Sequence, residues 1–290
     1  MQSSRQVAIS IVNYGDGESL KHLLAEVSKY GAKPDYLLVD DSFSSDENKQ
    51  LVAELCDDFS SELNISLFAE GVNPGYGGGH NHNAQYLESI KFDGIFVVVN
   101  PDVIFTEHAL ADLLSHSKQG VAAMLAAKDE YGQVLYNCLR LNGISQHWEI
   151  NDNPLSATDY LAGSFFGIHI DDYLHVGGFL DHYFLYWEEV DLSLRLKAKG
   201  VNLVCSSGDY IMRASNSLGT KINAIYYLIR NVFLFVNDGE NRNRTGLYGF
   251  IFKNFLRYTF WSLRYRKTTP IISFFKGLSD GMQGVDGVRR

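Results

Sequence analysis

Four short runs rich in β-branched residues recur at nearly constant intervals in the first part of the chain. They are VAISIV at 7–12, YLLV at 36–39, ISLF at 65–68 and IFVVV at 95–99. Their first residues are 29, 29 and 30 positions apart, which is the length of one strand and one helix. The runs are apolar without alternation, as is typical of parallel strands covered on both faces. We therefore expect the first 110 residues or so to form an open, doubly wound, mainly parallel α/β sheet.

Polar residues follow each of these strands. They are Asn13-Tyr14-Gly15, Asp40-Asp41-Ser42, the segment NPGYGGGHNHN at 73–83, and Asn100-Pro101-Asp102. In an open parallel sheet, ligands bind beyond the carboxyl ends of the strands. The convergence of ligand-capable residues at all four ends predicts a binding site along this edge.

The glycine-rich segment 73–83 allows two interpretations. Glycines let backbone amides approach a ligand closely or adopt positive φ. The segment follows the third strand and lacks the spacing of a dinucleotide fingerprint, which excludes a nicotinamide site. A purely structural turn remains open.

Asp102 is a candidate metal ligand because it follows the most hydrophobic strand at the expected ligand edge. Magnesium and manganese ions are commonly held by one or two carboxylates together with substrate oxygens. The alternative is that Asp102 caps a helix beginning near Thr106 or Glu107.

An acidic cluster lies in the segment DHYFLYWEEVDL at 181–192. Glu188, Glu189 and Asp191 precede basic residues and a glycine, which is the polarity of a helix, although alternating apolar residues also fit a strand. On a helix, Glu188 and Asp191 would share a face with Arg195, and Glu189 would point elsewhere. The segment is either a charged helix surface or a site, and the aromatic residues before the carboxylates favour a sugar site.

The bulk composition fits one large globular domain with an appendage. The chain has 290 residues, of which 46% are hydrophobic. Its three cysteines, Cys56, Cys138 and Cys205, are far apart and form no CxxC, so we expect reduced thiols rather than disulfides or a zinc site. The polar start at 1–6 predicts no signal peptide, and no run reaches the roughly 20 apolar residues of a membrane span.

Charge is distributed unevenly along the chain. Residues 241–290 hold ten Lys or Arg and two Asp, a charge of +8. Since the net charge of the whole chain is −9, residues 1–240 carry −17. On a helical projection Lys253, Arg257 and Arg264 fall within about 40° of one another, among aromatic and aliphatic residues. This pattern predicts a helix at an anionic membrane interface. The alternatives are a solvated basic helix, or an apolar face that packs on the catalytic domain or a second subunit.

Six segments, taken in order, resemble a known family. They are ISIVNYG at 9–15, VDDSFSSD at 39–46, NPGYGGGHNHN at 73–83, NPDV at 100–103, AGSFFGIHIDDYLHVGGFLDHYFLYWEEVDLSLRLKAKG at 162–200 and YYLIRN at 226–231. The chain resembles family-2 glycosyltransferases of the GT-A fold, particularly rhamnosyltransferase-like enzymes of bacterial surface polysaccharide assembly. The resemblance implies a GT-A catalytic domain at 1–222, with a nucleotide-sugar half at about 1–110 and an acceptor half at about 111–222. A helical, membrane-proximal extension at 223–290 would follow. Independently of the resemblance, the polar segment 129–154, with its glycines and Asn153-Pro154, predicts an irregular lid or variable loop region.

The resemblance also implies residue roles. The donor nucleotide would contact Tyr14, Asp40, Asp41, Asn73, Gly75 and Asn100. Asp102 would bind Mg²⁺ or Mn²⁺ on the donor diphosphate. The acceptor hydroxyl would lose its proton to Glu189, with Asp191 and Glu188 as second and third candidates.

The chain departs from the family pattern at three positions. Glu189 stands where an Asp is usual, and Asp41 where an Asn is usual. Within 212–217, Met212 stands where a His is common, and Arg213 beside it could supply positive charge directly. No Gln-x-x-Arg-Trp motif of processive members is present in the sequence, which favours transfer of a single sugar.

The implied activity is inverting transfer of one sugar to a hydroxyl group in O-antigen or other cell-surface polysaccharide synthesis. A dTDP-rhamnose donor is favoured, and UDP-galactofuranose or another hexose donor is possible. The acceptor would be a saccharide or a lipid-linked saccharide, with a polyprenyl-diphosphate link favoured, at the inner face of the cytoplasmic membrane. No nucleic acid would be bound. A catalytically degenerate binding subunit and a nucleotidyltransferase are the alternatives, although the loop 13–17 lacks the cation that a nucleotidyltransferase would usually carry.

Overall fold

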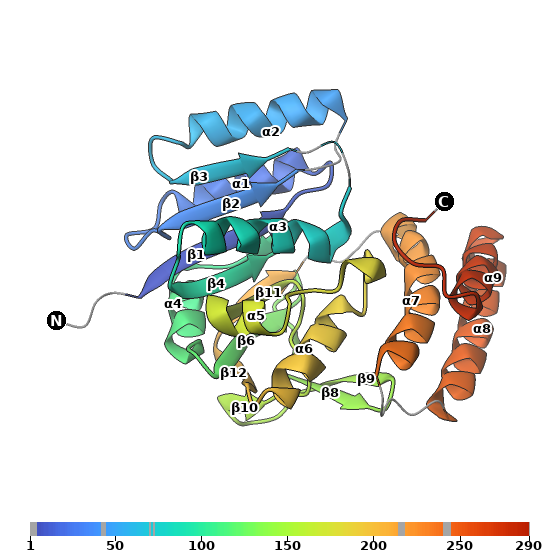
Figure 1. Ribbon diagram of the computed structural model, residues 1–290. Coiled ribbons are helices and arrows are strands. Elements are labelled where there is room, and N and C mark those ends of the chain that lie inside the picture. The colour runs from blue at the N-terminus through green and yellow to red at the C-terminus, as the bar shows by residue number, and fades with distance from the viewer. Residues whose placement is uncertain are drawn as a thin grey trace.

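The chain forms an α/β body followed by three C-terminal helices (Figure 1). The computed structural model describes residues 5–41, 45–69, 71, 73–213, 218–239 and 245–289. Parts of two expected motifs, 42–44 and 214–217, lie outside the described residues. The four expected strands are present as β1 (Gln6–Val12), β2 (Tyr36–Asp40), β3 (Ile65–Phe68) and β4 (Gly94–Val99). Helices α1 (Gly17–Val27), α2 (Asp46–Asp58) and α3 (Gly75–Ser89) connect them.

The central sheet confirms the doubly wound, mainly parallel expectation for the first half of the chain. Its order along the main path is β10-β12-β6-β11-β4-β1-β2-β3, and β1 pairs in parallel with both β2 and β4. Helices cover both faces of the sheet, and the parallel strands β1, β2 and β3 all end on the side that faces the C-terminal helices (Figure 1). Because β4 is buried along its whole length, its apolar run needs no alternation.

The second half of the chain extends this sheet with mixed strand directions. The added elements are β5 (Val103–Ile104), α4 (Glu107–His116), β6 (Val121–Lys128), β10 (Leu155–Ala157), β11 (Phe165–His169), α5 (Ile170–His175), α6 (Glu188–Ala198) and β12 (Asn202–Arg213). Strand β11 runs antiparallel between β4 and β6, so the residues just before it lie beside the carboxyl end of β4. The Asn100 amide accordingly donates a hydrogen bond to the Ser164 carbonyl oxygen, 2.9 Å away.

The expectation that the segment 129–154 is irregular is wrong. The segment contains β7 (Val134–Tyr136) and a hairpin of β8 (Cys138–Asn142) and β9 (Ser145–Glu149). Its two-residue turn is Gly143-Ile144, between the paired residues Asn142 and Ser145. Gly143 has φ +62°, and glycine at the first turn position is typical of a tight type II′ hairpin turn. The buried side chains of Leu139 and Ile144 anchor the hairpin to the core.

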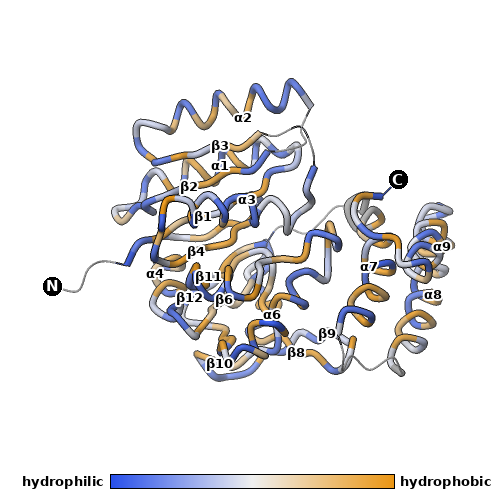
Figure 2. Tube along the Cα trace, viewed as in Figure 1, coloured by the Kyte–Doolittle hydropathy of each residue, from blue (hydrophilic) through white to orange (hydrophobic). Residues whose placement is uncertain are grey.

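The C-terminal helices pack on the body and on one another. They are α7 (Leu218–Asp238), α8 (Thr245–Tyr265) and α9 (Thr269–Met282), and hydrophilic and hydrophobic residues are interleaved along α8 and α9 (Figure 2). Phe250 of α8 packs against Trp187, and Tyr258 packs against Phe274 of α9. Over the described part of the chain, no helix combines the length and apolar character needed to cross a bilayer. The three cysteines are free and buried, as expected for thiols without a disulfide role.

Candidate active site

Two cavities meet beyond the carboxyl ends of the central strands. The strand-end cavity, of about 400 Å³, is lined by Val12, Asn13, Tyr14, Asp40, Asn73, Pro74, Gly75, Tyr76, Phe184, Leu185, Tyr227, Val288 and Arg289. The carboxylate cavity, of about 250 Å³, is lined by Tyr76, Asn100, Tyr136, Leu139, Gln146, Trp148, Tyr160, Ala162, Gly163, Ser164, Leu185, Tyr186, Glu188, Glu189 and Arg213. Tyr76 and Leu185 line both, so the two cavities adjoin each other.

Four of the six residues expected at the nucleotide line the strand-end cavity: Tyr14, Asp40, Asn73 and Gly75. The Asp40 carboxylate is almost completely buried and lies 3.0 Å from the imidazole of His82. Tyr14 is 65% exposed, which leaves its ring available to a flat ligand. Strand ends thus bring an aromatic ring and a carboxylate into one cavity.

The other two expected nucleotide contacts lie elsewhere. Asp41 is fully buried and its carboxylate accepts a hydrogen bond of 2.8 Å from the side-chain amide of Asn13, which does line the cavity. Asn100 lines the carboxylate cavity. Asp41 therefore does not line the strand-end cavity itself. It orients Asn13, which does.

The glycine-rich segment forms the first turns of α3 rather than a loop. Gly75 is the one glycine of this segment with positive φ, at +78°, and a Cβ there would lie 2.5 Å from the Phe184 carbonyl oxygen. The Tyr76 amide donates to that same oxygen over 2.9 Å. A Cβ on Gly79 would lie 2.6 Å from Val12. The glycines therefore allow α3 to pack closely on β1 and on the loop before α6.

Glu188 and Glu189 open α6 and both line the carboxylate cavity, so the acidic cluster starts a helix. Glu189 lies deep in the protein but opens to the cavity. Burial raises the pKa of Glu189 to about 7, against the opposing effects of the backbone N–H groups of Glu189 and Trp187 and the charge of Arg213. Burial and the charge of Glu189 hold the pKa of Glu188 well above its ordinary value. A carboxyl group with a pKa near neutrality is suited to accept and release protons.

Asp191 faces the protein interior. Its carboxylate lies 2.6 Å from Nε of Arg195, and it does not line the carboxylate cavity. Arg195 also donates to the carbonyl oxygens of Val176 and Gly178, at 2.5 and 2.7 Å. This buried ion pair fastens α6 to the turn after α5. Asp191 and Arg195 share a face of α6, as expected for a helix, whereas Glu189, which was expected to point elsewhere, lines the same cavity as Glu188.

The loop before α6 has an unusual backbone. Phe184, Tyr186 and Trp187 have φ values of +65°, +68° and +79°, in the left-handed region that side chains other than glycine rarely adopt. Each such residue costs on the order of 1–3 kcal/mol and persists only where the surroundings enforce it. The conformation turns Tyr186 and the two glutamates toward the carboxylate cavity.

Two buried residues of α7 enforce this loop. The side-chain nitrogen of Asn231 lies 2.7–2.8 Å from the carbonyl oxygens of Tyr183, Leu185 and Tyr186. Arg230 donates to the Tyr183 oxygen over 2.7 Å. The sequence patterns assigned no role to this pair. The signal that could have found it is Arg-Asn inside an apolar run, because such residues must bind polar groups if they are buried, as both are here.

Asp102 is exposed in the turn between β4 and β5. It lines neither of the two cavities and instead borders a small cavity beside α1. Burial and the charges of Glu188 and Glu189 raise the pKa of Tyr186 to about 12. Asp102 adds a smaller effect in the same direction, so its carboxylate lies near the site. Thr106 caps α4 by accepting a hydrogen bond from the Ala109 amide, so Asp102 is not needed as a cap.

Arg213 ends β12 and lines the carboxylate cavity, where it is the one Lys or Arg among the lining residues. Its charge acts on the pKa values of Glu189, Tyr76 and Tyr136. Met212, which precedes it, pairs with Ile104 of β5 and lies outside both cavities. Arg213 therefore places a positive charge at the site, one residue after Met212, the position where the family commonly has a histidine.

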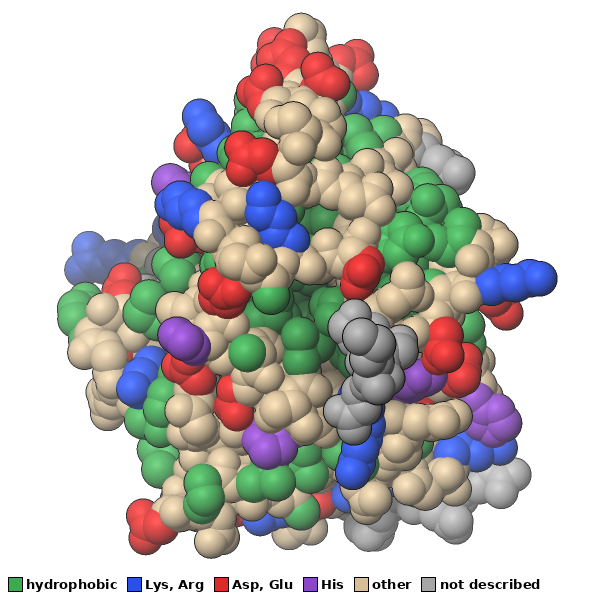
Figure 3. Space-filling view, turned by 90° about the vertical axis from the view of Figure 1, so that its left-hand side faces the viewer, with side chains coloured by type: hydrophobic (Ala, Val, Ile, Leu, Met, Phe, Trp, Pro, Cys, Tyr) green, Lys and Arg blue, Asp and Glu red, His purple; other side chains and the backbone are tan. Residues whose placement is uncertain are grey.

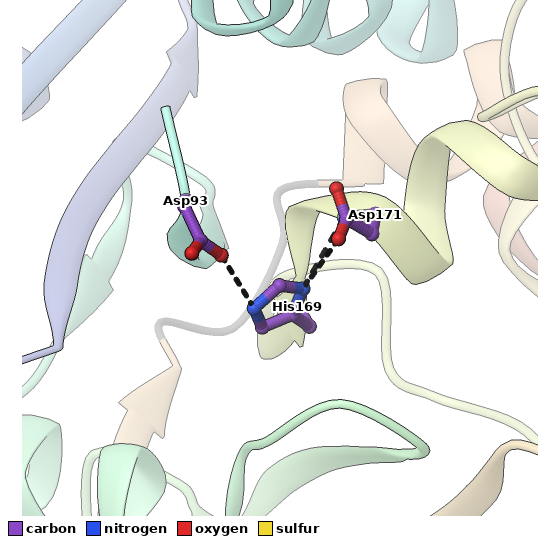
Figure 4. A group of neighbouring side chains, drawn as sticks. All are labelled: Asp93, His169 and Asp171. Atoms are coloured by element: carbon purple, nitrogen blue, oxygen red, sulfur yellow. Dashed lines mark hydrogen bonds and ion pairs between the residues drawn. The ribbon is translucent and has the colours of Figure 1, made fainter. Parts of the chain in front are cut away.

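A cluster of potential metal ligands lies far from these cavities. In the described ranges, Asp93, His169 and Asp171 are the one group of at least three His, Cys, Asp or Glu side chains close enough to hold a metal ion (Figure 4). His169 lies 3.2 Å from Asp93 and 3.8 Å from Asp171. The cluster lies at the amino end of β4, at the opposite end of the strands from the two cavities. On the side of the molecule that Figure 3 shows, acidic and basic side chains are interspersed. The cluster cannot contact a ligand in the two cavities.

Comparison with known proteins relates this site to sugar transfer. No family model matches the chain. The rhamnosyltransferase WbbL of Escherichia coli is 25% identical over 220 residues, covering 68% of this chain and 79% of that protein. The N-acetylglucosaminyl-diphospho-decaprenol L-rhamnosyltransferase of Mycobacterium tuberculosis is 24% identical over 242 residues, covering 72% and 76%.

Solved structures share the fold. GalNAc-T7 with UDP, GalNAc and Mn²⁺ matches with a TM-score of 0.64 and 13% identity over 80% of this chain, which spans 48% of that protein. The mannosyltransferase PcManGT of Pyrobaculum calidifontis, with GDP-Man and Mn²⁺, matches with a TM-score of 0.61 and 11% identity over 97% of this chain and 76% of that one. Both neighbours are GT-A glycosyltransferases. With its sheet, its paired cavities and these relatives, the chain is a glycosyltransferase of the GT-A fold that is similar to rhamnosyltransferases.

Proposed function

We propose that the protein transfers one sugar, with inversion, from a nucleotide-diphosphate donor to a hydroxyl group of a saccharide acceptor. A dTDP-rhamnose donor is favoured by the two rhamnosyltransferase relatives, and UDP-galactofuranose or another hexose donor is the next candidate. The observation that carries the proposal is the position of Glu189. A carboxyl group with a pKa of about 7 lies in an aromatic-lined cavity that shares a wall with the strand-end cavity.

The strand-end cavity would hold the nucleotide. Tyr14 offers an exposed ring to the base, and Asp40 offers a carboxylate to ribose hydroxyls. Asn73 and Gly75 form the opposite wall at the start of α3. The sugar of the donor would then extend past Tyr76 into the carboxylate cavity.

A divalent metal fits the donor side of this arrangement. Asn100 lines the carboxylate cavity with a buried side-chain oxygen that has no hydrogen-bond partner in the described part of the chain. Asp102, two residues later, supplies a carboxylate, and one such ligand suffices where phosphate oxygens complete the coordination of Mg²⁺ or Mn²⁺. We assign Asp102 as the ligand, with Asn100 beside it. When bound, the metal would offset the negative charge of the diphosphate.

The reaction would be a single displacement. The acceptor hydroxyl oxygen forms a bond to the anomeric carbon while the bond from that carbon to the phosphate oxygen breaks. The departing electron pair leaves with the nucleoside diphosphate, whose charge Arg213 helps to stabilise. Glu189 accepts the hydroxyl proton. Attack on the face opposite the leaving group inverts the anomeric centre.

The acceptor would bind in the carboxylate cavity. Tyr136, Trp148, Tyr160 and Tyr186 supply aromatic surface on which sugar rings can pack. The Mycobacterium tuberculosis relative is named for an acceptor linked to decaprenyl diphosphate. By analogy we propose a polyprenyl-diphosphate-linked saccharide of a cell-surface polysaccharide, such as O-antigen, as the acceptor here.

Helix α8 supports a location on the membrane surface. One of its faces packs on the protein, whereas Tyr248, Phe252, Leu256, Phe260 and Leu263 are 52–82% exposed and recur at helical spacing. The exposed Lys253, Arg257 and Arg264 border this stripe. An exposed apolar stripe edged by cations suits an anionic bilayer interface, here proposed as the inner face of the cytoplasmic membrane.

Binding to liposomes tests this location. The full-length protein should co-sediment with vesicles containing anionic lipid, and less so in high salt. Replacing Phe252 and Phe260 with Ser should weaken this sedimentation without lowering nucleotide binding. Failure of the wild-type protein to bind anionic vesicles at low salt would refute a membrane role for α8.

The proposed activity is tested by nucleoside diphosphate release. Purified protein with Mn²⁺ is offered a panel of nucleotide sugars, with and without saccharide acceptors linked to short prenyl diphosphates. Acceptor-dependent release is expected, and Glu189→Gln should bind donor yet lose about 10²–10⁴ in rate, the usual effect of removing a general base. A Glu189→Gln variant within about threefold of the wild-type rate would move the base to a neighbouring residue.

A further inference from the structure

A third cavity, of about 370 Å³, lies between the β8–β9 hairpin and α8. We call it the helix cavity. Gln146 of β9 lines both this cavity and the carboxylate cavity, so the two are direct neighbours. No residue lines both the helix cavity and the strand-end cavity, which places it on the acceptor side of the carboxylate cavity.

The helix cavity is cationic. Lys253 and Arg257 lie one turn apart on α8 and both line it, together with His147 of β9. Across the described residues, neither Lys253 nor Arg257 forms an ion pair with a carboxylate. Arg257 lies near the Tyr258 hydroxyl, since burial raises the pKa of that hydroxyl while the charge of Arg257 lowers it. Two adjacent cations without a carboxylate partner in a concave site favour a ligand of high negative charge, such as a phosphate group.

One residue in the wall of this cavity, Gly249, is a glycine although the fold does not require one there. Gly249 lies inside α8, where glycine is less favourable than alanine. A Cβ at this position would meet nothing within 4 Å, and its φ is not positive. Neither backbone conformation nor a neighbouring atom therefore explains the glycine. The space that it leaves open belongs to the helix cavity.

The cations lie between this cavity and the exposed apolar stripe of α8. On a helical projection at 100° per residue, Lys253 and Arg257 lie about 20° and 60° beyond the edge of the exposed apolar stripe. The opposite face, with Asn254 and Tyr258, is buried. A ligand held by the two cations can therefore place an apolar chain along Leu256 and Phe260 and extend a polar end toward Gln146.

We propose that the helix cavity binds the diphosphate group of a prenyl-diphosphate-linked acceptor through Lys253 and Arg257. The acceptor sugar would reach the carboxylate cavity past Gln146, and the prenyl chain would leave along the exposed stripe. This inference rests on the proposed function, because it names the subsite for the acceptor's charged part. It also gives α8 a role in recognising the acceptor in addition to one at the membrane.

Farnesyl diphosphate is a suitable probe because it contains the diphosphate and a short prenyl chain but no sugar. Its binding to the full-length protein is measured by calorimetry below its micelle concentration, without vesicles, with EDTA and a saturating nucleoside diphosphate present. The Lys253→Gln/Arg257→Gln double variant should bind at least tenfold more weakly. Farnesol should also bind at least tenfold more weakly than farnesyl diphosphate, because it lacks the charge.

Two further variants separate the cavity from general attraction by positive charge. Arg264→Gln removes an exposed cation of the same helix that does not line the cavity, and it should bind farnesyl diphosphate like the wild type. Gly249→Leu should fill the cavity and weaken binding without changing the charge. Unchanged binding by the double variant, or equal losses for the double variant and Arg264→Gln, would overturn the proposal.

The design also separates this proposal from the proposed function. Glu189→Gln should lose transfer but bind farnesyl diphosphate normally. If the protein transfers sugar to a neutral saccharide but fails to bind farnesyl diphosphate, the helix cavity is not a diphosphate subsite and the proposed activity stands. If it binds the probe but releases no nucleotide with any donor, the subsite stands and the proposed activity fails.

Discussion

The protonation of Glu189 should govern the pH dependence of transfer. An ordinary glutamate has a pKa of about 4.5, so a base with that value would be ionised throughout the range from pH 6 to 8. With a pKa of about 7, half of the enzyme holds Glu189 as the carboxylate at pH 7 and about a tenth does so at pH 6. We therefore expect kcat/KM to fall about fivefold from pH 7 to pH 6, and about tenfold for each further pH unit below that.

Arg213 provides a second, directional test of the same reasoning. Its positive charge lowers the pKa of Glu189, so Arg213→Gln should move the rising limb of the profile to higher pH. Burial and the charge of Glu189 raise the pKa of Glu188 well above its ordinary value, which favours the protonated form, and Gln imitates that form. Glu188→Gln should accordingly retain a rising limb, whereas Arg213→Gln should shift it.

The assay measures nucleoside diphosphate release at subsaturating donor and acceptor, from pH 5.5 to 8.5 in buffers of constant ionic strength. Far-ultraviolet circular dichroism at each pH checks that the protein stays folded. A profile that is flat between pH 6 and 8 would refute the assignment of a raised pKa to the catalytic base. A shift to lower pH in Arg213→Gln would refute the sign of the Arg213 effect.

Three further predictions follow from the packing around the site. Asp102→Asn should abolish the metal-dependent thermal stabilisation by nucleoside diphosphates while leaving the melting temperature of the free protein unchanged; full, EDTA-sensitive activity in this variant would contradict the metal assignment. Asn231→Ala leaves buried carbonyl oxygens of the loop before α6 without their donor, and should lower the free energy of unfolding by about 1–3 kcal/mol and reduce kcat more than nucleotide binding. Gly75→Ala places a Cβ 2.5 Å from the Phe184 carbonyl oxygen at positive φ and should cost at least about 2 kcal/mol in chemical denaturation, whereas Gly71→Ala, where a Cβ meets nothing within 4 Å, is the matched control and should be nearly neutral.

The sequence by itself determined the architecture of the first half and one edge of the site. The repeated apolar runs specified β1 to β4. The central strands β1, β2 and β4 are mostly buried on both faces, which requires a continuous apolar run, and the half-buried edge strand β3 was recognised by its β-branched run and its spacing. The sequence also specified that the residues after those strands would meet, since the carboxyl ends of parallel strands share an edge. Tyr14, Asp40 and Asn73 lie together for that reason. The glycine turn of the β8–β9 hairpin, at Gly143-Ile144, was an equally local signal.

Only the tertiary structure decided which carboxylates face the cavity. Glu188, Glu189 and Asp191 are neighbours on one helix, but Arg195 draws Asp191 inward while the loop before α6 turns the glutamates toward the site. That loop is held by Asn231, whose partners lie 45–48 positions earlier in the chain. The antiparallel β11 likewise brings Ser164 to Asn100. Such contacts join distant segments through backbone carbonyls, which every residue carries, so no local pattern of side chains could specify them.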